Sequence, residues 1–188
     1  MPNSTERSPK PRKRQDDDPF ADLIAEHRLV RKLYRQYRRL LDAGEAGRTA
    51  ADRESLARQL CAAIAAHADL EERVLYPALR AAGLDSHLMD EADVEHATAR
   101  DLIARIEATA PGDDKFDARV IVLCEYVEHH VKEEEGEMFP QARQTKELDS
   151  AALKSRLDQG RARAEARRSG ADAHPRSQAH RGPATAAR

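Results

Sequence analysis

CAAIAAHADLEERVLYP, residues 61–77, recurs without a gap 63 residues later as CEYVEHHVKEEEGEMFP, residues 124–140. The positions shared by the two copies are Cys61/Cys124, His67/His130, Glu71/Glu134, Glu72/Glu135, Tyr76/Phe139 and Pro77/Pro140. A weaker repeat, offset by 69 residues, matches Glu26-His27 with Glu95-His96 and Arg31 with Arg100. The repeats predict a molecule made of two similar helix pairs.

Apolar residues at spacings of three and four predict four amphipathic helices. They cover about residues 19–44, 49–76, 86–110 and 113–140, and Gly or Pro stands at their ends. Short loops between helices of this length are typical of an antiparallel up-down four-helix bundle. With 4% aromatic residues and few β-branched runs, a β-sandwich is not expected. A further helix is predicted around residues 148–168, followed by a disordered end.

Histidine and glutamate occupy positions on the apolar faces of these helices, where a bundle needs Leu or Ile. His67 and Glu71 lie four residues apart and share one helix face, and the repeat gives His130 and Glu134 the same spacing. Because a buried carboxylate without a partner is costly, inward glutamates require a cation. Imidazole and carboxylate ligands from facing helices suit iron or manganese. The predicted metal ligands are His27, His67, Glu71, His96, His130 and Glu134.

The neighbouring polar residues are predicted to lie outside the ligand set. Glu72 and the rest of the acidic run at 133–137 are expected to face solvent, and substitution of Glu72 or Glu135 is expected to be nearly silent. His129, about 100° around the helix from His130, is expected at the surface or behind a ligand. Tyr34 and Tyr126 are predicted to pack in the core, with a hydrogen bond to a ligand or to bound oxygen as the functional alternative. No residue is assigned a catalytic role.

The 188 residues fit one domain with two tails: 1–18 disordered, 19–145 the bundle, and 146–188 a basic, partly helical tail. Residues 19–150 hold 18 Lys/Arg against 27 Asp/Glu, whereas residues 151–188 hold 9 against 3. No aromatic residue interleaves the arginines of the tail, so nucleic-acid binding is not expected. The absence of a signal-peptide or membrane-spanning pattern predicts a cytoplasmic protein. Cys61 and Cys124, expected to be buried, suit that reducing compartment.

The segments HADLEERVLYP (67–77), Glu95-His96 and HHVKEEEGEMFP (129–140), together with His27, resemble the bacterial hemerythrin HHE cation-binding family over about residues 19–145. The resemblance implies two iron ions in an oxo- or hydroxo-bridged centre. Glu71 and Glu134 would bridge the ions and the four histidines would be terminal ligands. It also implies dioxygen, peroxide or nitric oxide as the small ligand.

One position departs from the oxygen carriers of this family, which have a second histidine on the third helix. Ala92 stands there, four residues before His96. One iron is then a ligand short, and water, Glu95 or a tyrosine could complete its coordination. An open position favours redox chemistry over reversible oxygen carriage.

Three functions remain in competition, and whether the protein is an enzyme is left open. The first is a di-iron protein that binds or reacts with the small ligands named above, with no membrane partner. The second is an iron- or oxygen-responsive regulatory module that signals through its basic tail. The third is a metal-free helical scaffold, which would leave Glu71 and Glu134 buried without a cation.

Overall fold

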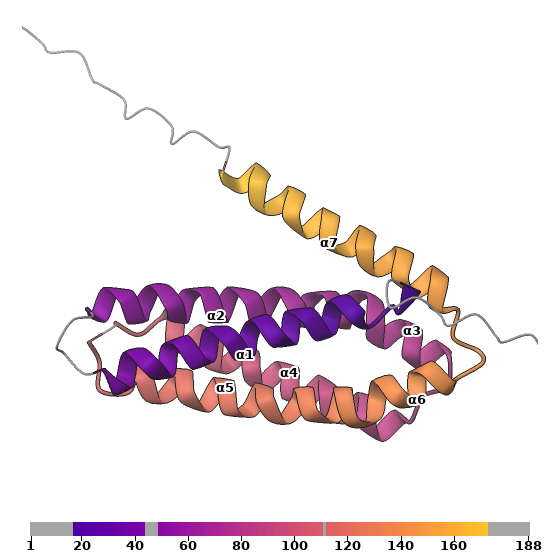
Figure 1. The fold of residues 1–188 in the computed structure, drawn as a ribbon, viewed down its shortest axis with the longest axis horizontal. Coiled ribbons are helices and arrows are strands. Elements are labelled where there is room, and N and C mark those ends of the chain that lie inside the picture. The colour runs from indigo at the N-terminus through magenta and orange to yellow at the C-terminus, as the bar shows by residue number, and fades with distance from the viewer. Residues whose placement is uncertain (1–16, 44–48, 111, 173–188) are drawn as a thin grey trace, which may run out of the picture.

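The computed structural model describes residues 17–43, 49–110 and 112–172, and every regular element in these ranges is a helix (Figure 1). The elements are α1 (Ala21–Asp42), α2 (Ala50–Leu70), η2 (Glu71–Leu75), α3 (Tyr76–Ala81), α4 (Ser86–Glu107), α5 (Phe116–Glu133), η3 (Glu134–Met138), α6 (Phe139–Gln144) and α7 (Ser150–Asp172). The long helices α1, α2, α4 and α5 run up and down side by side. This is the predicted helical bundle, and α7 is added outside it.

Local sequence signals set several helix ends. Thr49 caps α2, because its side chain accepts a hydrogen bond from the backbone of Asp52 while the Asp52 carboxylate accepts one from the Thr49 backbone. Asp85 caps α4 through the backbone N–H of His87. Gly83, with φ of 80°, makes the left-handed turn after α3, where a side chain would be strained. These caps fix where the helices of each pair begin and end.

The helices that carry the repeat do not stop before Pro77 and Pro140, as the sequence had suggested. Each passes through a π-helical turn, η2 or η3, and continues beyond the proline as α3 or α6. In these turns the backbone N–H of Tyr76 donates to the carbonyl of Glu71, and that of Phe139 donates to the carbonyl of Glu134. A proline conflicts with the carbonyl four residues earlier in a regular helix, and here that carbonyl belongs to the π turn. The wider turn therefore accommodates the proline without ending the helix.

Helix α7 is longer than predicted and packs on the bundle through its first half. It begins at Ser150 and continues past Ser169, where disorder was expected, to Asp172. Leu153 and Leu157 are buried, and α7 contacts α2 and η2 while its far end points away from the bundle (Figure 1). The disorder predicted for residues 1–16 and 173–188 concerns parts of the chain outside the described residues.

The core consists of two apolar clusters, one toward each end of the bundle. One contains Leu23, Leu70, Ala92 and Met138 and lies near α3, α6 and α7, whereas the other contains Val30, Ile64, Ala99 and Leu123. Along each long helix, the inward histidine stands between residues of the first cluster and residues of the second. The buried polar residues therefore form a layer across the middle of the bundle. No helix in the described ranges is long and apolar enough to cross a membrane.

Candidate metal centre

The structure brings all six predicted ligands together in this layer, as two sets of donor atoms. Nε2 of His27 lies 2.8 Å from Nε2 of His67, and Nε2 of His96 lies 3.1 Å from Nε2 of His130. Three of these imidazoles are buried and His67 is nearly so, with 10% of its side chain exposed. Each pair joins one single histidine of the weak repeat to one histidine of the strong repeat.

The two glutamates connect the two histidine pairs. Oε1 of Glu71 lies 3.1 Å from Nε2 of His67, and its Oε2 lies 3.6 Å from Nε2 of His96. In the same way, Oε2 of Glu134 lies 3.2 Å from Nε2 of His27, and its Oε1 lies 3.6 Å from Nε2 of His130. Each carboxylate thus presents one oxygen to each pair. Both glutamates are fully buried.

A second ring of carboxylates holds the histidines from behind. Nδ1 of each imidazole lies 2.6 to 3.0 Å from a glutamate oxygen. The pairs are His27 with Glu135, His67 with Glu26, His96 with Glu72 and His130 with Glu95. An Nδ1–H that donates outward fixes the ring and leaves the lone pair of Nε2 facing inward, which is the form that binds a metal.

Glu72 and Glu135 lie further outward than Glu71 and Glu134, as predicted, but each also contacts a predicted ligand, and the sequence did not indicate this contact. Both carboxylates are about one-third exposed, but each accepts a hydrogen bond from a ligand imidazole on another helix. Each of these carboxylates also forms an ion pair with an arginine. Arg31 lies 3.0 Å from Glu135, and Arg100 lies 2.8 Å from Glu72. Glu95, considered above as a replacement ligand, instead holds Nδ1 of His130. The outer ring could have been found from the repeat, because it matches Glu26 with Glu95 and Glu72 with Glu135.

Tyr76 is a site residue that the sequence did not single out. Its hydroxyl donates to Oε1 of Glu134 at 3.0 Å and lies 3.2 Å from Nε2 of His96 and 3.4 Å from Nε2 of His130. The equivalent residue of the other half, Phe139, stacks on His27 at 6.0 Å between ring centroids. The two halves therefore differ, since a phenol stands at the His96–His130 pair and a phenyl ring at the His27–His67 pair. Burial and the charges of Glu71 and Glu134 raise the pKa of Tyr76 well above 10.

The other aromatic and polar candidates lie at the margins. Tyr126 lines a cavity beside the histidines and Tyr34 packs against the second apolar cluster. His129 is 64% exposed and its Nε2 lies 3.2 Å from Glu133. Cys61 and Cys124 are buried free thiols, and burial raises the pKa of each.

The electrostatics of this layer require positive charge. Within the described ranges, neither oxygen of Glu71 accepts a hydrogen bond, and Oε2 of Glu134 does not either. Burial lowers the pKa of His67, but the negative charge of Glu71 and the hydrogen bond to Glu26 outweigh this effect and raise the pKa to about 10. Burial also lowers the pKa of His130, but the charges of Glu134 and Glu95 outweigh this effect and raise the pKa to about 9. A carboxylate and imidazole set with unpaired inward oxygens fits metal ions.

The donor atoms divide into two groups that could each hold one ion. The first is His27, His67, Glu71 and Glu134, and the second is Glu71, His96 and His130. Donor atoms within each group lie within 4.8 Å of one another. Glu71 belongs to both groups, and the Oε1 atom of Glu134 adds a contact to the second.

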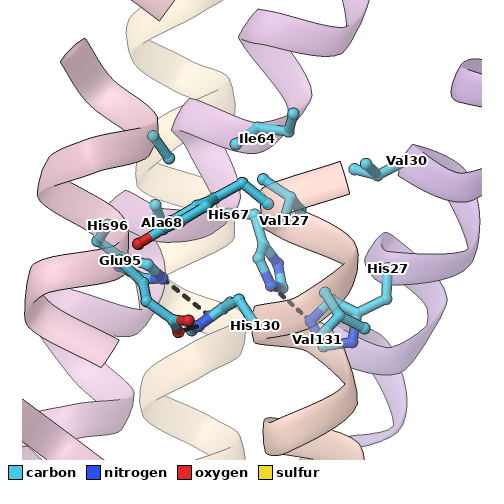
Figure 2. Close-up of a pocket in the computed structure, with 12 residues that line it drawn as sticks. His27, Val30, Ile64, His67, Ala68, Glu95, His96, Val127, His130 and Val131 are labelled. Atoms are coloured by element: carbon cyan, nitrogen blue, oxygen red, sulfur yellow. Dashed lines mark hydrogen bonds and ion pairs between the residues drawn. The ribbon is translucent and has the colours of Figure 1, made fainter. Parts of the chain in front are cut away.

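An apolar cavity of about 30 Å³ lies against the inward histidines (Figure 2). Besides the four imidazoles, its lining includes Val30, Ile64, Ala68, Ala99, Val127 and Val131. A cavity of this size has room for a water-sized molecule. The layer of ligands therefore has a small, mostly apolar space beside it.

Comparisons with known proteins show the family and the fold of this chain. The hemerythrin HHE cation-binding domain profile matches residues 18–142. The crystal structure of a hemerythrin HHE cation-binding domain-containing protein from Mycobacterium kansasii has the same fold, with a TM-score of 0.61, 23% identity, and 82% of this chain and 89% of that chain covered. A DNA nickase from a Nostoc species is 34% identical over 76 residues, which span 40% of this chain and 21% of that protein. The chain belongs to the hemerythrin HHE cation-binding domain family.

Proposed function

We propose that the protein holds two non-haem iron ions, bridged by Glu71 and Glu134, and reacts there with dioxygen, peroxide or nitric oxide. The observation that carries the proposal is the placement of each glutamate, which presents one oxygen to each histidine pair. A carboxylate in this position would contact both ions, one through each of its oxygens. Mixed imidazole and carboxylate ligands from the core of a bundle suit iron.

The side chains would divide the work between the two positions. His27 and His67 would hold one ion, and His96 and His130 the other. Tyr76 would complete the second position, on the side where Ala92 replaces a histidine, since its hydroxyl already contacts both imidazoles. When bound, an iron pair supplies one-electron redox steps at each ion. The valines and alanines of the cavity would exclude bulk water and admit only a small ligand.

Metal analysis of the purified protein tests the di-iron proposal directly. We expect about two irons per chain, and loss of both in Glu71→Ala and Glu134→Ala, because each glutamate would contact both ions. Glu137→Ala, an exposed position of the same acidic run, is the matched control and should keep both irons. A folded wild-type protein that contains no metal and does not change when a chelator is added would contradict the proposal.

The role of Tyr76 is tested by absorption spectroscopy of the oxidised, iron-loaded protein. A tyrosinate bound to ferric iron absorbs visible light, so Tyr76→Phe should lose that band while iron content stays near two per chain. Tyr34→Phe removes a phenol that lies outside the site and should leave the spectrum unchanged. An unaltered visible spectrum in Tyr76→Phe would exclude the phenol as a ligand.

The preference for redox reaction over oxygen carriage has its own experiment. The reduced protein would be mixed in turn with dioxygen, hydrogen peroxide and nitric oxide, and the consumption of each would be followed. We expect net turnover or irreversible oxidation. A stable oxygenated form that releases dioxygen intact over many cycles would show that the protein is a carrier.

A further inference from the structure

Helix α7 packs directly over the segment that carries Glu71. Leu153 and Leu157 are buried in the same apolar cluster as Leu70, which precedes the π turn η2, and Leu75, which is its last residue. At Gly160, α7 lies so close to the end of α2 that an added Cβ would be 2.6 Å from Cδ1 of Leu70. Glycine at this position allows the approach.

The internal repeat shows that this docking surface is specific to one half of the bundle. Leu70 and Val74 are apolar and covered, whereas their repeat counterparts, Glu133 and Glu137, are acidic and reach solvent. The half with η2 thus has an apolar surface that α7 covers. The half with η3 has a charged surface that needs no cover.

Arg161 extends this contact to a predicted metal ligand. Its Nε donates to Oε1 of Glu26 at 2.7 Å, and Oε2 of Glu26 accepts from Nδ1 of His67 at 2.6 Å. The guanidinium also lies 3.6 Å from Asp22, beside Glu26 on α1. A chain of two hydrogen bonds therefore joins α7 to the metal centre.

Arg161, which contacts Glu26, lies on α7, whereas the arginines that contact other outer carboxylates lie on helices of the bundle. Arg31 and Arg100, which hold Glu135 and Glu72, are repeat partners within the bundle. Glu95 is the repeat counterpart of Glu26, and among the described residues its outer contact is not an arginine but the exposed His129, at 4.0 Å. The support of Glu26 thus depends on α7.

We infer that α7 is a clamp on the metal position of His27 and His67, with Arg161 as a positioning residue that acts through Glu26. The inference rests on the proposed function, because it concerns how one of the two ions is retained. Removal of a partner that orients a metal-bound histidine typically weakens metal binding about 10- to 100-fold. By linkage, the same coupling makes metal occupancy favour the docked state of α7.

Release of iron to an excess of chelator tests the clamp in the full-length, iron-loaded protein. Arg161→Met should release one of the two irons faster than wild type, by up to the roughly 10- to 100-fold that loss of Glu26 itself would cause, and the other at the wild-type rate. Arg163→Met, an exposed position on the same helix, should release both at the wild-type rate. Acceleration of neither iron, or equal acceleration of both, would overturn the inference.

A double-mutant cycle separates positioning from a general structural role. If Arg161 acts through Glu26, Arg161→Met should have no additional effect on iron release in a Glu26→Ala background. Arg161→Lys, which keeps a donor and a charge, should recover part of the slow release. Independent, additive effects of the two substitutions would show that Arg161 does not act through Glu26.

Gly160→Val tests the helix contact without removing Arg161, because the larger side chain conflicts with Leu70. It should accelerate release of the same single iron. In addition, hydrogen exchange of residues 150–169 should be slower in the iron-loaded than in the metal-free wild type, and equal exchange would contradict the coupling. A wild-type protein that holds no iron would refute the proposed function itself. A wild-type protein that holds two irons, with an Arg161 variant that releases both at the wild-type rate, would refute only the clamp.

Discussion

At the scale of single residues, the site is controlled by what each imidazole contacts on its outward side. Glu26, Glu72, Glu95 and Glu135 accept from Nδ1 and so direct Nε2 toward the interior. A neutral imidazole with its other nitrogen hydrogen-bonded to a carboxylate is a more basic and better-oriented ligand. The outer carboxylates are therefore expected to determine metal affinity although they are not ligands.

Substitution of the outer carboxylates is the first prediction. Glu72→Ala and Glu135→Ala should each weaken iron binding about 10- to 100-fold, because His96 or His27 loses the partner that orients it. Competition titration against a chelator of known affinity measures the change. Glu137→Ala, in the same acidic run and exposed, is the control. Wild-type affinity in both variants would mean that the imidazoles are oriented by packing alone.

Proton release on metal binding is the second prediction. In the metal-free protein, His67 with a pKa of about 10 and His130 with a pKa of about 9 are protonated at neutral pH. Because these pKa values are raised, the protons are held below pH 9 and must leave when a metal binds. Apparent affinity should then rise with pH from 7 to 9, about tenfold per unit for each displaced proton. Calorimetry in buffers of different ionisation enthalpy counts the protons, and pH-independent binding would contradict the prediction.

The sequence identified the inward residues because the repeat places them at equivalent positions of an apolar stripe. Tyr76 was not identified as a site residue, for a geometric reason. It lies five residues after Glu71, about 140° away on a regular α-helix, and so it did not belong to the ligand face. In the structure, the π turn η2 directs Tyr76 inward, and no feature of the local sequence predicts such a turn. Its repeat partner is a phenylalanine, which gave no hint of polar chemistry.

At the scale of elements, each π turn places the residue five positions after the glutamate one helical turn from it. The Tyr76 and Phe139 backbones bond to the carbonyls of Glu71 and Glu134, so their rings stand one turn from the carboxylates. Helix existence and the bundle arrangement could be predicted from periodicity, as could the start of α2 near residue 49. The ends at Pro77 and Pro140 could not, because proline stops a regular helix and the widened turn removes the conflict.

Gly136 offers a test of whether the π turn η3 needs a glycine. It lacks a positive φ, a Cβ added there meets nothing within 4 Å, and its repeat counterpart in η2 is Arg73. Gly136→Ala should therefore stabilise the protein by about 0.5 to 1 kcal/mol, because alanine loses less backbone entropy on folding. Chemical denaturation measures the difference. Destabilisation would show that the turn depends on a freedom that only glycine has.

At the scale of the whole molecule, two apolar clusters enclose a layer that holds two fully buried carboxylates, those of Glu71 and Glu134. The clusters explain why the bundle forms, and the layer explains why its stability should depend on a ligand. The two halves are related by the repeat, but in the described part of the chain α7 packs mainly on α2 and η2, which belong to one half. The molecule thus combines a symmetric ligand set with an asymmetric outer support, and the sequence repeat alone shows only the symmetric part.

Removal of metal should therefore destabilise the whole fold and not only the site. An ion present at 100 times its dissociation constant adds about 2.7 kcal/mol to the free energy of unfolding. For a chain of this size that raises Tm by about 5 to 10 °C per bound ion. Chelation of the wild type should lower Tm by at least this amount, and iron should restore it. The Glu71→Gln, Glu134→Gln double variant keeps the shape of the two side chains but loses their charges, so its Tm should not respond to iron or chelator. A wild-type Tm that is equally unresponsive would mean that protons on the histidines already satisfy the two carboxylates, and that the layer folds without needing a metal.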